Sequence, residues 1–177
     1  DELIIKRVLD SGAMGVIVPN IKNENDAKQA IKYAKSPPYG ERGVGLARAQ
    51  MYGKYFDKYI KNSKSIKVIL QIENKYAIEN IESILKLKYL DGTIIGPYDL
   101  SASMGKIGKL NDPLVKKTID YYEKISKKFK VPMGYHIVNL DSNLLKRKIR
   151  KGYKFLAYGT DMIFLQHSLN KELKKIS

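Results

Sequence analysis

Two acidic residues lie at the ends of two predicted neighbouring strands, where their side chains could hold a metal ion. Glu73 closes the apolar run VILQIE, and Asp99 lies in GPYD, just after the apolar run that ends at residue 95. In parallel βα folds, reactive groups gather where strands end. Mg²⁺ typically takes one or two protein carboxylates and fills its other positions with water and substrate oxygens. The pair therefore predicts a divalent-cation site.

Three other interpretations compete with a cation site. Glu73 could cap the following helix, and Asp99 could close an Asx-turn within its own loop. Two carboxylates also suit glycoside hydrolysis, but the chain has no Trp to serve as a sugar platform. A zinc cage is disfavoured, because the chain contains no Cys and only two His residues.

Further polar residues share the predicted strand ends. Gln71 lies on the same strand face as Glu73, because side chains alternate with a period of two. His136 ends another strand and either takes part in function or fills the mouth of the fold, whereas His167 lies in the last predicted helix and reads as structural. The segment PPYGERGVGLAR at 37–48 contains three Gly and two Arg, which suits either a carboxylate clamp or a structural loop at a subunit contact.

Apolar periodicity places these residues on alternating strands and helices. Such alternation predicts an α/β fold with a parallel sheet. The predicted strands cover 16–18, 68–73, 90–95, 131–137 and 153–158. The predicted helices cover 2–11, 23–36, 54–62, 75–87, 113–129, 141–151 and 161–175, with a long polar loop between 96 and 112.

The composition is strongly basic. In 177 residues, 33 Lys and Arg face 18 Asp and Glu, which gives a formal charge of +15. Lys outnumbers Arg more than fivefold and is spread along the predicted helices, which favours solvated helix faces over nucleic-acid binding. The sequence shows neither a signal peptide nor an apolar run of about 18 residues that could span a membrane. We therefore expect a soluble, cytoplasmic protein.

The order of several sequence strings resembles the HpcH/HpaI aldolase family. The strings are GVIVP, SPPYGERGVGLARAQ, LQIENKYAIENIESIL, LDGTIIGPYDLSASMG and GYKFLAYGTDMIFL, and together they extend over nearly the whole chain. The resemblance implies a (β/α)8 barrel, usually assembled into hexamers. It also implies a metal-dependent (class II) pyruvate aldolase, which forms or cleaves a carbon–carbon bond of a 4-hydroxy-2-oxo acid. The reaction would pass through a metal-bound pyruvate enolate, with an aldehyde as the second substrate.

The resemblance also implies roles for individual residues. Glu73 and Asp99 would bind Mg²⁺, Mn²⁺ or Co²⁺, and Gln71 would line the substrate site. The backbone amide at Tyr98 would hold the pyruvate carboxylate.

Two more residues match the family at a distance from these strand ends. Asp10 would raise the basicity of a catalytic His, and Arg42 would lie near the mouth of the active site.

The family pattern begins before residue 1 of this sequence. The catalytic His and a carboxylate-binding Arg would precede Asp1, so residues 1–177 are expected to form strands four to eight of one barrel domain within a longer polypeptide. Two alternatives stay open: a related lyase that acts on a CoA thioester, and a barrel fragment without activity that serves as a binding or scaffold protein.

Overall fold

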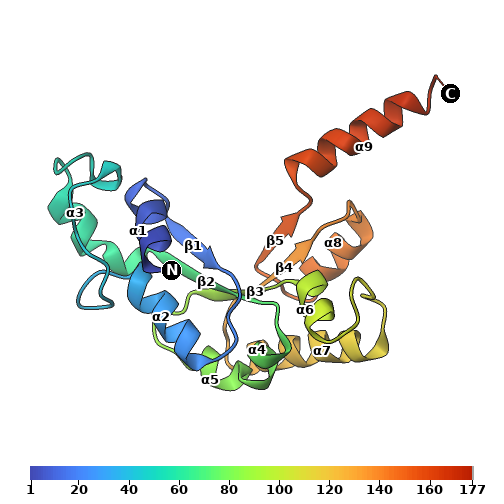
Figure 1. The fold of residues 1–177 in the computed structure, drawn as a ribbon, viewed down its shortest axis with the longest axis horizontal. Helices are drawn as coiled ribbons and strands as arrows, with labels where there is room; N and C mark the ends of the chain where they lie inside the picture. Colours follow the sequence, from blue (N-terminus) through green and yellow to red (C-terminus); the bar gives the residue numbers. More distant parts are fainter. Residues whose placement is uncertain (177) are drawn as a thin grey trace.

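The structure is a computed structural model and describes residues 1–176. Five strands pair in parallel and in sequence order, which confirms the predicted α/β fold and its strands. The strands are β1 (Gly15–Val18), β2 (Lys67–Ile72), β3 (Gly92–Ile95), β4 (Met133–Ile137) and β5 (Phe155–Tyr158). Figure 1 shows that they fan into one curved sheet, as in part of a barrel.

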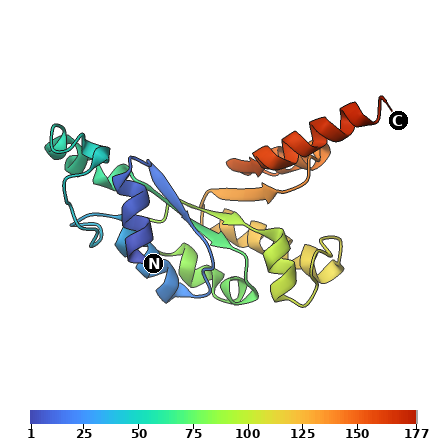
Figure 2. The same cartoon turned by 45° about the horizontal axis from the view of Figure 1, so that its top comes forward.

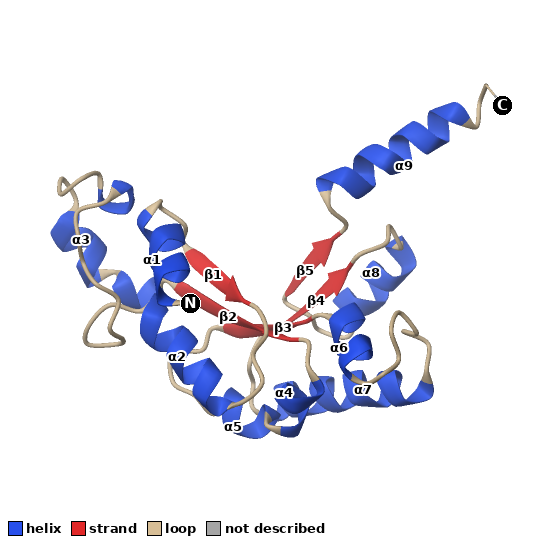
Figure 3. Ribbon diagram, in the orientation of Figure 1, coloured by secondary structure: helices blue, strands red, loops and turns tan. Residues whose placement is uncertain are grey.

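Helices follow the strands and cover the convex side of the sheet (Figure 3). The α-helices are α1 (Glu2–Asp10), α2 (Glu24–Ala34), α3 (Phe56–Lys61), α4 (Lys75–Glu79), α5 (Ile81–Leu85), α6 (Pro97–Ser103), α7 (Pro113–Lys128), α8 (Ser142–Arg150) and α9 (Asp161–Leu173). Helix α9 projects away from the rest of the molecule in two views (Figures 1 and 2), and none of its residues is buried. Among residues 1–176, no helix is both long enough and apolar enough to cross a membrane.

The structure differs from the sequence-based expectation in two helices. Helix α6 occupies the start of the expected polar loop: Pro97 opens it at the first helical position, and the buried Leu100 anchors it. The single helix expected over 75–87 is divided into α4 and α5 at Asn80. The side-chain amide of Asn80 donates to the carbonyl of Tyr76 at 2.8 Å, a local bond that competes with regular helix geometry.

Alternation along the strands gives the sheet an outer and an inner face. On β2, Val68, Leu70 and Ile72 are fully buried against the helices, so Ile69 and Gln71 lie on the inner face.

The inner face is closely packed where β4 meets β5. A Cβ atom at Gly134 would meet the ring of Phe155 at 2.3 to 2.8 Å, far closer than a normal contact. The Phe155 ring therefore occupies the space that a side chain at residue 134 would need.

At the N-terminal edge of the sheet, Arg42 joins three elements. Its guanidinium donates to the carbonyl of Ala34 (3.1 Å), to the carboxylate of Asp10 (2.9 Å) and to the hydroxyl of Tyr59 (3.0 Å). Asp10 also accepts from Lys6 one turn earlier on α1. Arg42 is only 2% exposed, so these bonds tie the glycine-rich loop to α1, α2 and α3 in a partly dry environment.

A second buried ionic cluster joins α7, α8 and the segment before β5. The carboxylate of Glu123 accepts from Lys148 (3.0 Å), Lys151 (2.8 Å) and the hydroxyl of Tyr153 (2.8 Å). The ammonium group of Lys148 also lies 4.0 Å from the centre of the Tyr135 ring. Burial raises the pKa of the Glu123 carboxyl, but the bonds and charges of Lys151 and Lys148 outweigh burial and hold that pKa below its usual value.

Replacing Arg42 is expected to destabilise the fold. Arg42→Ala removes a fully buried side chain and leaves the carbonyl of Ala34 and the hydroxyl of Tyr59 without their donor. It should lower the free energy of unfolding by about 2–4 kcal/mol. Arg48, in the same segment, is exposed, and Arg48→Ala should cost less than about 0.5 kcal/mol. Urea unfolding of both variants checks this; equal stability of the two would contradict a structural role for Arg42.

Replacing Glu123 is expected to have a similar cost and to alter the response to acid. Glu123→Ala leaves Lys148 charged and buried, so we expect a loss of about 3–5 kcal/mol. The folded-state pKa lies below the unfolded value of about 4.3, so this stabilisation is complete above that pH and is lost as the pH falls through the folded pKa.

Unfolding curves recorded between neutral pH and pH 3 measure both effects. Glu82→Ala removes an exposed pair with Lys128, in which Glu82 is 41% and Lys128 60% exposed. It is the matched control and should cost less than about 1 kcal/mol. An unfolding free energy that falls with acid as steeply in Glu123→Ala as in the wild type would refute the assignment to Glu123.

Candidate active site

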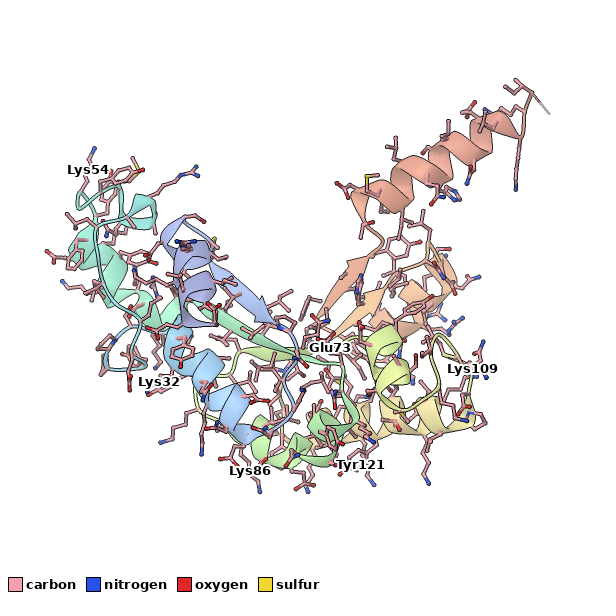
Figure 4. All side chains as sticks on the ribbon, viewed as in Figure 1. Lys32, Lys54, Glu73, Lys86, Lys109 and Tyr121 are labelled. Atoms are coloured by element: carbon pink, nitrogen blue, oxygen red, sulfur yellow. The ribbon has the colours of Figure 1, made fainter. Side chains whose placement is uncertain are left out.

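Glu73 follows the end of β2 directly and lies near the centre of the molecule (Figure 4). Its two carboxylate oxygens have separate donors. The backbone N–H of Asn20, in the loop after β1, donates to Oε1 at 2.7 Å, and the side-chain amide of Gln71 donates to Oε2. The carboxylate is therefore held in one orientation by two neighbouring strands, with lone pairs left for a further partner.

The structure tests whether Glu73 caps the helix that follows it. The following helix α4 is capped by Asn74, whose side chain accepts from the N–H of Tyr76 at 3.0 Å. Glu73 therefore does not cap the helix, and its carboxylate is available for other contacts.

Asp99 lies in the first turn of α6 and is exposed. Among residues 1–176 its carboxylate accepts no hydrogen bond and forms no ion pair, so the expected Asx-turn is not seen. The N–H groups of Tyr98 and Asp99 likewise find no acceptor within the described part of the chain. The start of α6 thus presents one free carboxylate and two free amides beside Glu73.

Gly96 brings the start of α6 against Glu73. A Cβ atom at this position would lie 3.1 Å from Cβ and 3.2 Å from Oε2 of Glu73, and 3.2 Å from the amide nitrogen of Gln71. Only a residue without a side chain allows this approach without displacing the carboxylate.

The donor set suits a hard divalent cation. Among the described residues, no three or more His, Cys, Asp or Glu side chains come together as a metal site. At this edge of the sheet, a cation would therefore have Glu73 and Asp99 as its carboxylate ligands from the described residues. Two carboxylates with open positions for water and substrate oxygens fit Mg²⁺ or Mn²⁺. The oriented carboxylate of Glu73 and the unpaired one of Asp99 therefore fit the predicted metal site.

The structure brings together some of the residues selected from the sequence and separates others. Gln71, Glu73, Tyr98 and Asp99 lie at the C-terminal ends of β2 and β3. Asp10 precedes β1 and bonds Arg42, so both lie at the opposite, N-terminal edge of the sheet. Within this chain they are not brought to Glu73, and their roles in catalysis stay predictions.

A hollow of about 650 Å³ lies beside β4 on the outer side of the sheet, between α7 and α8. Tyr98 and Asn139 form part of its rim, and the Asn139 amide donates to the Tyr98 hydroxyl at 3.1 Å. His136 and the cationic side chains of Arg147 and Lys116 also line it.

Sequence reasoning missed the contribution of Asn20. This residue has a positive φ of 57°, a conformation that Asn tolerates better than most residues, and the turn aims its N–H at Glu73. The Pro-Asn pair after the β1 run signals a turn, but nothing in the sequence shows which carboxylate the amide reaches.

The sequence of this chain matches one family model and several known proteins. The family model for HpcH/HpaI aldolase/citrate lyase matches residues 1–168. The 5-keto-4-deoxy-D-glucarate aldolase of Enterobacter sp. (strain 638) is 32% identical over 163 residues, which are 92% of this chain and 63% of that protein. The protein of the same name from Escherichia coli O157:H7 is 31% identical over the same shares. The chain thus spans less than two thirds of the length of these relatives.

Solved structures agree with this result. An HpcH/HpaI aldolase from Desulfitobacterium hafniense DCB-2 superposes with a TM-score of 0.89 at 28% identity, over 99% of this chain and 68% of that one. A family protein from Burkholderia cenocepacia J2315 gives a TM-score of 0.92 at 27% identity, over 99% and 70% of the two chains. The chain belongs to the HpcH/HpaI aldolase/citrate lyase family.

Proposed function

We propose that the complete protein is a divalent-metal-dependent aldolase that cleaves or forms a 4-hydroxy-2-oxo acid, with pyruvate and an aldehyde as the two halves. One observation carries the proposal: the Glu73 carboxylate is fixed by two donors directly beside Gly96 and the start of α6. The names of the relatives support the aldolase class.

Each side chain of the site has a separate task in this proposal. Glu73 and Asp99 hold Mg²⁺, Mn²⁺ or Co²⁺, and Gln71 keeps the Glu73 carboxylate in position. The free N–H groups of Tyr98 and Asp99 bind the carboxylate of pyruvate, since backbone amides at a helix start favour anions. A bound cation supplies Lewis acidity, which stabilises the negative charge that develops on the 2-oxo oxygen.

We also propose that the sheet is part of a closed barrel, with β1 to β5 as strands four to eight of one domain. Ile17, which shares the inner face with Ile69, is 49% exposed. The outer edges of β1 and β5 carry no partner strand among residues 1–176. Further strands against these edges would satisfy their backbone groups and cover the inner face.

Asp10 and Arg42 lie at the opposite edge of the sheet, so within one subunit they do not reach the mouth of the site. Their proposed roles are that Asp10 supports a catalytic His and that Arg42 shapes the mouth of the site through the glycine-rich loop. Both roles therefore require a neighbouring subunit of a homo-oligomer.

The metal ligands can be tested by removing one charge at a time. Glu73→Gln and Asp99→Asn keep the shape of each side chain but weaken cation binding. We expect each to lower metal-dependent pyruvate release from a 4-hydroxy-2-oxo acid by at least about 100-fold, the upper end of the loss caused by groups that merely support a metal ligand.

The measurement pairs this assay with calorimetric titration of Mn²⁺ into the complete protein. Glu79→Gln, an exposed position on α4, is the matched control and should keep full activity. Full activity in Glu73→Gln or Asp99→Asn would refute the metal site. Cleavage of a CoA thioester with no cleavage of the 4-hydroxy-2-oxo acid would favour the related lyase, and absence of both would favour a binding or scaffold protein.

Gly96 offers a second test of the same geometry. The backbone angles at Gly96 (φ −101°, ψ 91°) suit any residue, so Gly96→Ala should leave the unfolding free energy nearly unchanged. Its new methyl group would crowd Glu73 Oε2 and Gln71, and we expect kcat/KM to fall by about 10–100-fold, as for changes that disturb a ligand's supporting contacts. Gly45→Ala, where no atom lies within 4 Å of the added Cβ, is the control; equal kinetics in the two variants would refute the crowding.

A further inference from the structure

The sheet register places His136 in the same row as Glu73. Residues Ile72 and Ile95 are partners across β2 and β3, and Ile95 is the partner of Tyr135 across β3 and β4. One residue further along each strand, Glu73, Gly96 and His136 therefore stand side by side, and His136 is the partner of Ala157 on β5.

The side chain of His136 shares the inner face with that of Glu73. The preceding residue, Tyr135, packs on the outer face, where its ring meets Tyr153 at 5.6 Å and lies under the ammonium group of Lys148. Alternation then turns His136 to the inner face. Paired residues in a sheet share a face. A Cβ atom added at Gly96 would lie 3.1 Å from Cβ of Glu73, so Gly96 and Glu73 belong to the same face.

Residues with little or no side chain flank His136 in this row. Two strand spacings separate the Cα atoms of Glu73 and His136, which is about 10 Å. Gly96 lies between them and has no side chain, and Ala157 beyond His136 has only a methyl group. Within the described residues the imidazole of His136 makes no hydrogen bond and is only partly buried.

We infer that His136 determines specificity by hydrogen-bonding the polar substituent, a hydroxyl or a carboxylate, of the aldehyde half of the substrate. This inference rests on the proposed function, in which pyruvate lies beside Glu73 and Asp99. The aldehyde must then extend along the row from the cation toward His136.

An isosteric pair of aldehydes isolates this contact. Glycolaldehyde and propionaldehyde differ by a hydroxyl in place of a methyl group, and glyoxylate tests the carboxylate. A site that hydrogen-bonds a substrate hydroxyl rejects the analogue that lacks it, because its own polar group is left unpaired. For addition to pyruvate, we expect the wild type to have a higher kcat/KM with glycolaldehyde than with propionaldehyde. If the substituent that His136 binds is a carboxylate, kcat/KM with glyoxylate should also exceed that with propionaldehyde.

The variants change the partner without changing the fold. His136→Leu should reduce the ratio of kcat/KM for glycolaldehyde over propionaldehyde by about 10–100-fold, the range for loss of one such contact. His136→Gln, which retains a donor, should recover part of the ratio. His167→Leu replaces an exposed His on α9 and is the matched control, with an unchanged ratio.

Exchange of the pyruvate methyl protons with D₂O, followed by NMR, distinguishes a failure of the proposed function from a failure of the role of His136. Exchange depends on the metal and pyruvate but needs no aldehyde. Metal-dependent exchange in the wild type together with an unchanged aldehyde ratio in His136→Leu overturns the role of His136 alone. Absence of exchange in the wild type overturns the proposed function and, with it, this inference. An equal shift of the ratio in His167→Leu also overturns the role of His136.

Discussion

The in-register pairing of five parallel strands is the constraint on which the site depends. Parallel pairing brings the carboxyl ends of all strands to one edge, and alternation along each strand decides which side chains share a face. Because Val68, Leu70 and Ile72 must face the helices, Gln71 and Glu73 must face inward. Slipping β2 by one residue would bury the carboxylate and expose the core.

The two edges of the sheet serve different purposes. At the N-terminal edge, charged groups are paired and largely buried, and the Arg42–Asp10 pair fixes the glycine-rich loop. At the C-terminal edge, Asp99 and two helix amides have no partner among residues 1–176, and Glu73 is held by an amide on each oxygen and by no Lys or Arg of this described part. This division is the one expected of βα folds, whose strand ends carry the chemistry while the opposite edge carries stability.

Much of this arrangement could be predicted from the sequence. Apolar runs and periodicity identified all five strands, and the position of Glu73 and Asp99 at strand ends identified the pair. The sequence did not show that α6 begins immediately after Gly96, since a seven-residue helix carries too little periodicity to stand out from a polar loop.

Two other features needed the three-dimensional structure. From the sequence, the segment that contains Arg42 suited either a carboxylate clamp or a structural loop at a subunit contact. In the structure each of the three guanidinium nitrogens donates to a protein acceptor, on α2, α1 and α3 respectively. The amide of Asn20 meets Glu73 across 53 positions of sequence, a contact that no local pattern encodes.

The close contact of Phe155 with Gly134 has a consequence for changing the floor of the site. The aromatic ring fills the space that a side chain at residue 134 would need, two residues before His136 on the same face. Residue 134 therefore cannot be enlarged while Phe155 is retained. A larger residue at 134 demands a smaller one at 155, and the effects of such paired changes will not add. Any redesign of the pocket depth therefore has to sample these two positions jointly.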